Sequence, residues 1–126
     1  MQVDGLITIL QELNSSSPDI EASAVISTVG LVIASVLPQN LDEDRVGAMT
    51  AALLSRAERT AIALDRGELK QFFLIAKQGG ILMVYVGEGA LLAVLTKPHI
   101  KSGFIFFTIE RLLDRIVEEI NKITVV

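Results

Sequence analysis

The sequence predicts an α/β protein in which one five-stranded antiparallel sheet carries helices on both faces. Three observations support this: three segments with helical apolar spacing, five short apolar runs bounded by turn residues, and no linker long enough to divide the 126 residues. The predicted order is α-β-β-α-β-β-β-α. The middle helix can cover one face while the terminal helices cover the other, which gives a three-layer α/β/α sandwich. We expect residues 1–126 to form a single domain.

The first third of the chain predicts a helix followed by a β-hairpin. Apolar residues recur at helical spacing over residues 3–13, and the polar cluster at 14–18 ends that pattern. Residues 20–38 are rich in Val, Ile, Ser and Thr, which favour strands. Gly30 divides them and can adopt the positive φ of a tight hairpin turn, so two antiparallel strands are expected.

The middle helix, predicted over residues 42–64, is apolar on more than one side. Asp42 is its expected N-cap. One stripe is expected to face the sheet and consists of Val46, Leu53, Ala57, Thr60 and Leu64. The roughly opposite side carries Ala48, Ala51, Ser55 and Ile62. A helix that is apolar on two sides needs two partners, so the sequence is typical of an interaction module.

The second half predicts a three-stranded meander and a final helix. Three apolar runs at 69–77, 81–86 and 90–96 are separated by short turns that each contain two glycines. The last helix begins within residues 101–104 and alternates an apolar stripe with a charged face.

Composition excludes several classes of function. The net charge of −4 and the absence of a Lys/Arg run disfavour nucleic acid as a partner. Cysteine is absent, so no disulfide or thiolate site exists. The longest uncharged run, 22–37, is shorter than a spanning helix and is interrupted by polar residues, so no membrane insertion is expected. The N-terminus resembles no secretory signal, and we expect a cytoplasmic protein.

No residue pattern predicts catalysis. His99 is the one histidine and stands beside Pro98 in an expected loop without a partner to orient it. The carboxylates at 42–44 are explained by helix capping, and no pattern indicates a metal site. The glycine pairs form turns between strands and do not precede a helix as a phosphate loop does. We therefore expect no enzyme activity, no metal and no cofactor.

Four segments in the predicted order resemble the Roadblock/dynein-light-chain family. They span residues 22–35, 51–59, 67–69 and 86–95, so the resemblance covers nearly the whole chain. Two positions depart from the family pattern: Val29 replaces a frequent acidic or polar residue, and Ala22 replaces a frequent glycine. The resemblance implies a profilin-like Roadblock fold.

The resemblance also implies a non-catalytic homodimeric regulator or scaffold of a small Ras-like GTPase. Prokaryotic members such as the gliding-motility B protein act as GTPase-activating partners. It implies that the strand after the middle helix pairs with its copy and that the two middle helices meet. The expected dimer interface is Ala48, Ala51, Ser55, Ile62, Phe72, Phe73, Leu74 and Ile75.

Residues on the middle helix supply candidates for contacting the GTPase. Arg45, Arg56 and Arg59 lie in a narrow arc beside Ala52, and this basic stripe could meet an acidic partner. The sequence equally allows these arginines to pair with nearby carboxylates in solvent.

The sequence is also compatible with a different strand placement and with different functions. The run 72–75 could be a central strand buried on both faces. The chain could be a dimeric structural scaffold in a motor or signalling complex, or a small-molecule sensor with a profilin-like fold.

Overall fold

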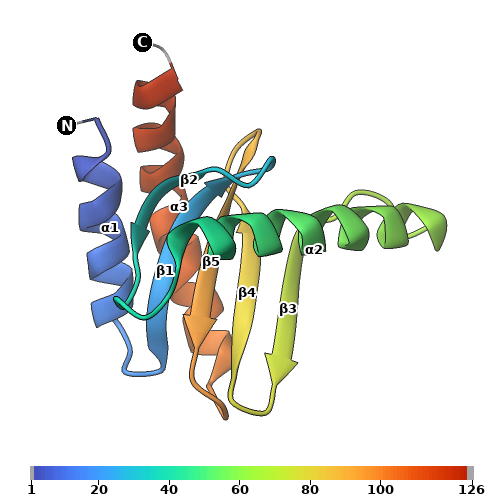
Figure 1. The fold of residues 1–126 in the computed structure, drawn as a ribbon, viewed down its shortest axis with the longest axis horizontal. Helices are drawn as coiled ribbons and strands as arrows, with labels where there is room; N and C mark the ends of the chain where they lie inside the picture. Colours follow the sequence, from blue (N-terminus) through green and yellow to red (C-terminus); the bar gives the residue numbers. More distant parts are fainter. Residues whose placement is uncertain (1, 125–126) are drawn as a thin grey trace.

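The computed structural model describes residues 2–124, and this part of the chain contains the eight predicted elements in the predicted order (Figure 1). Their bounds are α1 Asp4–Ser15, β1 Ile20–Ser27, β2 Val32–Val36, α2 Glu43–Ala63, β3 Gln71–Ala76, β4 Gly79–Tyr85, β5 Ala90–Thr96 and α3 Ser102–Thr124. The predicted α/β/α sandwich is confirmed, since α2 crosses one face of the sheet and α1 and α3 cover the other.

The five strands form one antiparallel sheet in the order β2-β1-β5-β4-β3. The hairpin β1–β2 turns at Gly30, whose φ of 95° is one that glycine adopts at little cost. The meander β3–β4–β5 joins the hairpin through β1 and β5, which lie at the centre. Strand β3 pairs only with β4 and therefore lies at an edge of the sheet. The interpretation of 72–75 as a central strand is wrong.

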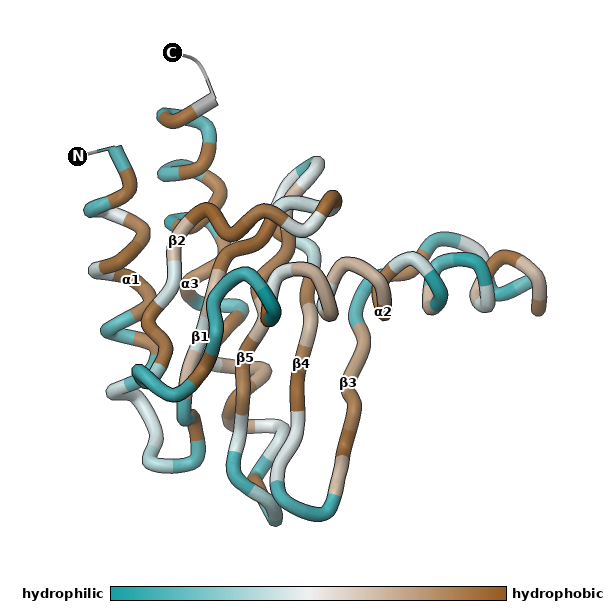
Figure 2. Tube along the Cα trace, viewed as in Figure 1, coloured by the Kyte–Doolittle hydropathy of each residue, from teal (hydrophilic) through white to brown (hydrophobic). Residues whose placement is uncertain are grey.

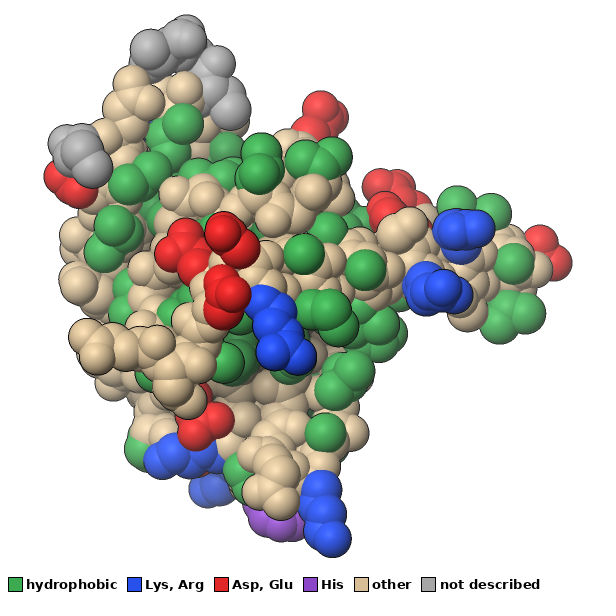
Figure 3. Space-filling model, in the orientation of Figure 1, with side chains coloured by type: hydrophobic (Ala, Val, Ile, Leu, Met, Phe, Trp, Pro, Cys, Tyr) green, Lys and Arg blue, Asp and Glu red, His purple; other side chains and the backbone are tan. Residues whose placement is uncertain are grey.

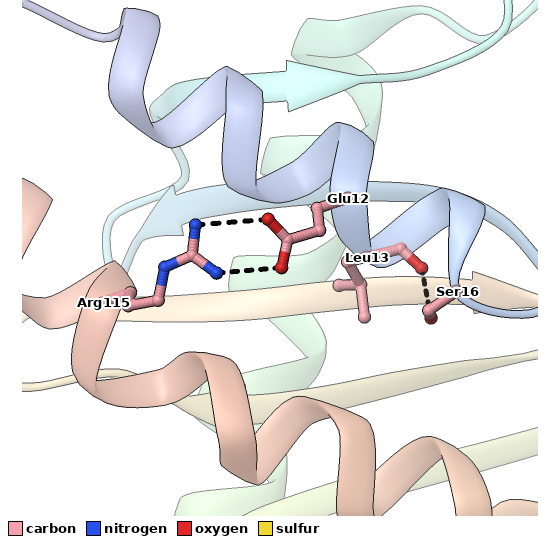
Figure 4. Close-up of polar contacts among 4 residues, drawn as sticks. All are labelled: Glu12, Leu13, Ser16 and Arg115. Atoms are coloured by element: carbon pink, nitrogen blue, oxygen red, sulfur yellow. Dashed lines mark hydrogen bonds and ion pairs between the residues drawn. The ribbon is translucent and has the colours of Figure 1, made fainter.

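The layer formed by α1, α3 and the sheet holds the larger core. Fully buried side chains from both helices, such as Leu10, Ile109 and Ile116, pack against the strands. Phe73 and Phe106 meet edge to face with ring centroids 6.4 Å apart. At the surface of this layer, Arg115 of α3 donates two hydrogen bonds to the Glu12 carboxylate of α1 (Figure 4). At the C-terminal end of α1, the Ser16 hydroxyl donates a hydrogen bond to the Leu13 carbonyl oxygen.

The α2 layer has a smaller core. Leu54 packs with Ala24, Leu91 and Ala93 of the sheet. As predicted, Asp42 caps the helix. Its Oδ1 atom accepts hydrogen bonds from the backbone N–H groups of Asp44 and Arg45, with N···O distances of 3.0 and 3.4 Å. The brown, apolar strands in Figure 2 lie beneath a helix whose own colouring alternates, as expected for an element buried along a narrow stripe.

Helix α2 projects beyond β3, so part of the predicted sheet-facing stripe is wrong (Figure 1). Val46 and Leu53 pack on the sheet as expected, whereas Thr60 and Leu64 are exposed. The cause is length: a helix of 21 residues is roughly 31 Å long, and five strands span only about 19 Å. The residues of α2 that are most buried are Gly47, Thr50 and Leu54.

Gly47 allows the start of α2 to approach the β1–β2 hairpin. A Cβ at this position would overlap the Gly30 carbonyl oxygen and would stand 3.0 Å from Cγ2 of Val32. Periodicity alone did not place this glycine against the sheet, because glycine contributes no apolar signal.

Candidate partner-binding surface

The free edge of β3 is the first part of the candidate site. Its four predicted interface residues alternate between the two faces: Phe72 packs in the α2 layer, and Phe73 packs in the α1/α3 layer. Leu74 is half-buried beneath α2, and Ile75 is 77% exposed. These side chains therefore do not form one patch. What they share is an unpaired strand edge whose N–H and C=O groups can pair with another chain.

The projecting half of α2 is the second part. Ile62 is 67% exposed and Leu64 is also largely exposed, although both are large apolar residues. Ala48 and Ser55, which lie earlier in α2 and are predicted to allow close helix approach, are exposed as well. Ala51 differs, because it is half-buried and its Cβ lies 3.4 Å from the position of a Cβ on Gly30. The hairpin of the same chain thus covers part of the predicted interface.

An apolar groove runs between α2 and the sheet, and we call it the α2 groove. It consists of two adjoining hollows of about 400 and 390 Å³ that share Met49, Thr50 and Ile81. Leu53, Leu74 and Met83 line the first hollow, and Val46 and Leu95 line the second. Met49 is largely exposed, so the groove opens to solvent beside the edge strand.

Basic side chains border the α2 groove. Arg45 lines one hollow, and Arg56 with the exposed Ala52 lines the other. Arg56 also borders a shallow hollow with Arg59, so the four predicted partner residues lie along one side of α2. Among the described residues none of the three arginines forms a salt bridge. The alternative interpretation, in which these arginines pair with nearby carboxylates, is therefore not seen in the described part of the chain.

The opposite side of α2 carries an acidic hollow of about 780 Å³. Its carboxylates come from α2, the loop before β3 and the β4–β5 turn, as Glu58, Glu68 and Glu88. The Tyr85 hydroxyl donates a hydrogen bond to Glu58. Burial, and then this bond, raises the pKa of Tyr85 well above its ordinary value, so the phenol stays protonated. Sequence reasoning missed this hollow because its residues come together only when α2 lies across the sheet.

Figure 3 shows both kinds of charge on the projecting helix, where blue basic side chains stand beside green apolar ones, with red acidic side chains to their upper left and at the free end. His99 lies on the exposed loop before α3 in a left-handed conformation with φ 60°.

In residues 2–124 no group of three or more His, Asp or Glu side chains is placed to hold a metal ion. No helix in that part of the chain is long and apolar enough to cross a bilayer.

Relatives of high sequence similarity occur in Methanocaldococcus jannaschii. The chain is 43% identical over 108 residues to "Uncharacterized protein MJ0310", a match that covers 86% of this chain and 93% of that protein. A second relative, "Uncharacterized protein MJ1340", is 42% identical with the same coverage.

Solved structures share the fold at low sequence identity. MglB of Myxococcus xanthus matches with a TM-score of 0.86 at 16% identity, over 96% of this chain and 98% of that one. A Roadblock/LC7 domain from Streptomyces avermitilis matches with a TM-score of 0.79 at 17% identity, over 95% and 98%. Schizosaccharomyces pombe profilin matches with a TM-score of 0.63 at 17% identity, over 89% and 96%. The model of the Roadblock/LC7 domain matches residues 6–96, and the chain therefore belongs to the Roadblock/LC7 family.

Proposed function

We propose that this protein is a homodimeric platform that binds and regulates a small Ras-like GTPase. The observation that carries the proposal is the free edge of β3 beneath a helix that projects past it. Both features leave apolar surface and backbone hydrogen-bonding groups exposed, and a second copy of the chain can cover them together.

Self-association through β3 would extend the sheet across a two-fold axis. An antiparallel partner strand would pair the free backbone groups, and the projecting α2 of each copy would pass over the other sheet. This arrangement would bury the exposed apolar side chains of Ile62, Leu64 and Ile75. Such an interface would combine strand pairing, the mode of β-augmentation, with contacts between helices.

The α2 groove is the surface we assign to the GTPase. Its floor is apolar, and Arg45 and Arg56 stand at its sides without a salt bridge among the described residues. An acidic partner with exposed apolar side chains would complement this surface in charge and polarity.

Sedimentation analysis tests the dimer. The wild-type protein should sediment at twice the monomer mass of 13.6 kDa. Ile75→Lys should sediment as a monomer, because a lysine on a strand edge disfavours edge-to-edge pairing. Val29→Lys is the matched control: Val29 is 79% exposed, comparable to Ile75, but lies at the hairpin turn of the opposite sheet edge, so its substitution should leave the dimer intact. A dimer that survives Ile75→Lys would contradict the interface.

Nucleotide-dependent capture tests the GTPase. Tagged protein is incubated with native extract containing GDP or a non-hydrolysable GTP analogue, and bound proteins are identified by mass spectrometry. A Ras-like GTPase enriched in one nucleotide state is expected, and Arg56→Glu combined with Arg59→Glu should abolish its capture. Arg66→Glu, an exposed charge reversal just beyond α2, is the control and should have no effect. Equal capture by all three proteins would contradict the assignment of the α2 groove.

A further inference from the structure

A separate hollow of about 210 Å³ lies at the N-terminal end of α3, on the face of the sheet opposite to α2. Strands β3, β4 and β5, the loop that follows β5 and the first residue of α3 line it. The hollow is separate from the α2 groove, although one of its lining residues, Ile75, also lies on the strand edge assigned to the proposed dimer. The assignment of the hollow does not depend on the proposed function.

Thr96 is one of the residues that line this hollow, and its buried hydroxyl has no hydrogen-bond partner among the described residues. Thr96 is 2% exposed, and its Oγ1 is the one buried side-chain polar atom in residues 2–123 for which the structure provides no partner. Leu92 and Val94 of β5 face the α1/α3 layer, so Thr96 points into the same layer. A Cβ on Gly80, which also lines the hollow, would stand 3.0 Å from Oγ1. Buried hydroxyls normally have a protein, water or ligand partner, so this one is available to hydrogen-bond to a bound group.

The first turn of α3 supplies further donors. The Lys101 carbonyl accepts from the N–H groups of Phe104 and Ile105 at 3.2 and 3.4 Å, which places Lys101 at the N-cap. A lysine side chain cannot accept a hydrogen bond, so the N–H groups of Ser102 and Gly103 have no capping side chain, unlike those that Asp42 caps in α2. Free N–H groups and the helix dipole favour an anion at this position.

The charged and apolar residues around the hollow indicate which kind of anion it can bind. Lys97 and His99 line it and Lys101 adjoins it, while no Asp or Glu is among the lining residues. One carboxylate, that of Glu21, comes within 3.9 Å of the position of a Cβ on Gly79. Blue basic side chains and the purple histidine lie at the lower end of the molecule in Figure 3, with red acidic side chains beside the blue ones at the lower left. The apolar side chains in the wall are those of Phe73, Ile75, Pro98 and Ile100.

We propose that this hollow binds a small organic carboxylate with a short branched apolar body. The Thr96 hydroxyl and the free N–H groups at the start of α3 donate to the carboxylate. Lys97 and Lys101 add favourable charge, and the apolar body lies against Phe73 and Ile100. One ligand would thus provide a hydrogen-bond acceptor for both the Thr96 hydroxyl and the free N–H groups at the start of α3.

NMR titration of the ¹⁵N-labelled full chain tests the site, with isovalerate as the probe and 3-methylbutanol as its uncharged counterpart. Isovalerate should give saturable shifts confined to residues 73–80 and 96–103, and the alcohol should give none there. Thr96→Val keeps the shape of the side chain and removes the hydroxyl, and it should raise the Kd about 3- to 10-fold. Lys122→Gln removes a lysine from the far end of α3 and should leave the Kd unchanged.

Three results would overturn the proposal: equal shifts with the alcohol, no saturation with isovalerate, or tighter binding of inorganic phosphate than of isovalerate. An unchanged Kd in Thr96→Val would do the same. If Thr96→Val loses its native circular dichroism spectrum, Lys101→Gln serves instead, because that side chain is exposed. It should raise the Kd about 2- to 5-fold and weaken its dependence on salt, and an unchanged Kd would contradict the site.

Discussion

The two faces of the sheet differ in how completely they are covered. On the α1/α3 face, two helices pack on the sheet and bury leucine and isoleucine side chains completely. An ion pair with two hydrogen bonds, between Arg115 and Glu12, joins these helices at the surface. On the α2 face, one helix crosses the strands, buries three of its own residues and projects past the sheet. The same sheet therefore supports one closed layer and one open layer.

This difference separates stability from recognition. Apolar burial is the main favourable term in folding, so the α1/α3 layer should supply most of the free energy of unfolding. The α2 layer retains exposed apolar side chains, which a monomer keeps only at a risk of aggregation. It also carries arginines without salt bridges among the described residues. A partner that covers the α2 layer removes that risk.

The largest expected effect comes from truncating an apolar side chain in the closed layer. Leu10 is fully buried, and Leu10→Ala should lower the free energy of unfolding by about 2 to 5 kcal/mol because it removes apolar burial and leaves a cavity. Ile62→Ala, in the projecting part of α2, should change the stability of the monomer by less than about 0.5 kcal/mol. Urea unfolding monitored by circular dichroism measures both.

The two substitutions must be compared in a monomeric background, because association adds to apparent stability. Ile75→Lys provides that background if the proposed interface is correct. A loss in Ile62→Ala as large as that in Leu10→Ala would show that the end of α2 packs against the fold, and the contrast between the layers would fail.

A smaller effect is expected where α2 meets the hairpin. Gly47→Ala should improve the helix propensity of α2 by roughly 1 kcal/mol. The added Cβ would overlap the Gly30 carbonyl oxygen, and because that atom belongs to the backbone, it cannot move aside cheaply. We expect a net loss of about 1 to 3 kcal/mol, measured by urea unfolding.

Gly103→Ala is the matched control, since Gly103 lies in the first turn of α3 and a Cβ there would meet no atom within 4 Å. That variant should be neutral or slightly stabilised. A stabilised Gly47→Ala would mean that α2 can shift away from the hairpin, and that the open layer is looser than its contacts indicate.

Local patterns in the sequence predicted the elements of this fold well. Strand β5 has the predicted bounds, Asp42 caps α2 as expected, and Gly30 makes the hairpin turn. These features depend on short stretches of chain, where alternation, capping and turn chemistry act directly. The edge position of β3 could not be derived in this way, because burial on one or both faces gives similar patterns in a short strand. The family resemblance predicted it.

The candidate site was predicted less completely, and the reason is geometric. The arginines of α2 could be placed in one arc from helical spacing, but the groove beside them also needs Leu74, Ile81 and Leu95 from three strands. The acidic hollow and the hollow below α3 likewise join distant segments. The projection of α2 depends on where the helix crosses the sheet, which a helical wheel does not contain. Thr60 and Leu64 were misplaced for that reason.

The smallest effect is expected at the ion pair that joins α1 to α3. Arg115 holds the pKa of the Glu12 carboxyl below its ordinary value, mainly through their hydrogen bonds. A carboxyl whose pKa is lower in the folded state contributes stability above its unfolded pKa, and this contribution is lost as the pH falls through the folded pKa. Both side chains are about half exposed, so the contribution is small.

Arg115→Gln should therefore return the pKa of Glu12 towards its ordinary value, as measured by carboxyl ¹³C shifts during an acid titration. Arg111→Gln is the graded control, because Arg111 lowers the same pKa only through charge and is the weakest of its causes, so the rise should be smaller. Equal rises in both variants would mean that the pair in Figure 4 is not held in solution. In that case apolar packing alone would hold α1 and α3 together. The two faces of the sheet would then differ in their buried cores and not in whether their surface arginines form ion pairs.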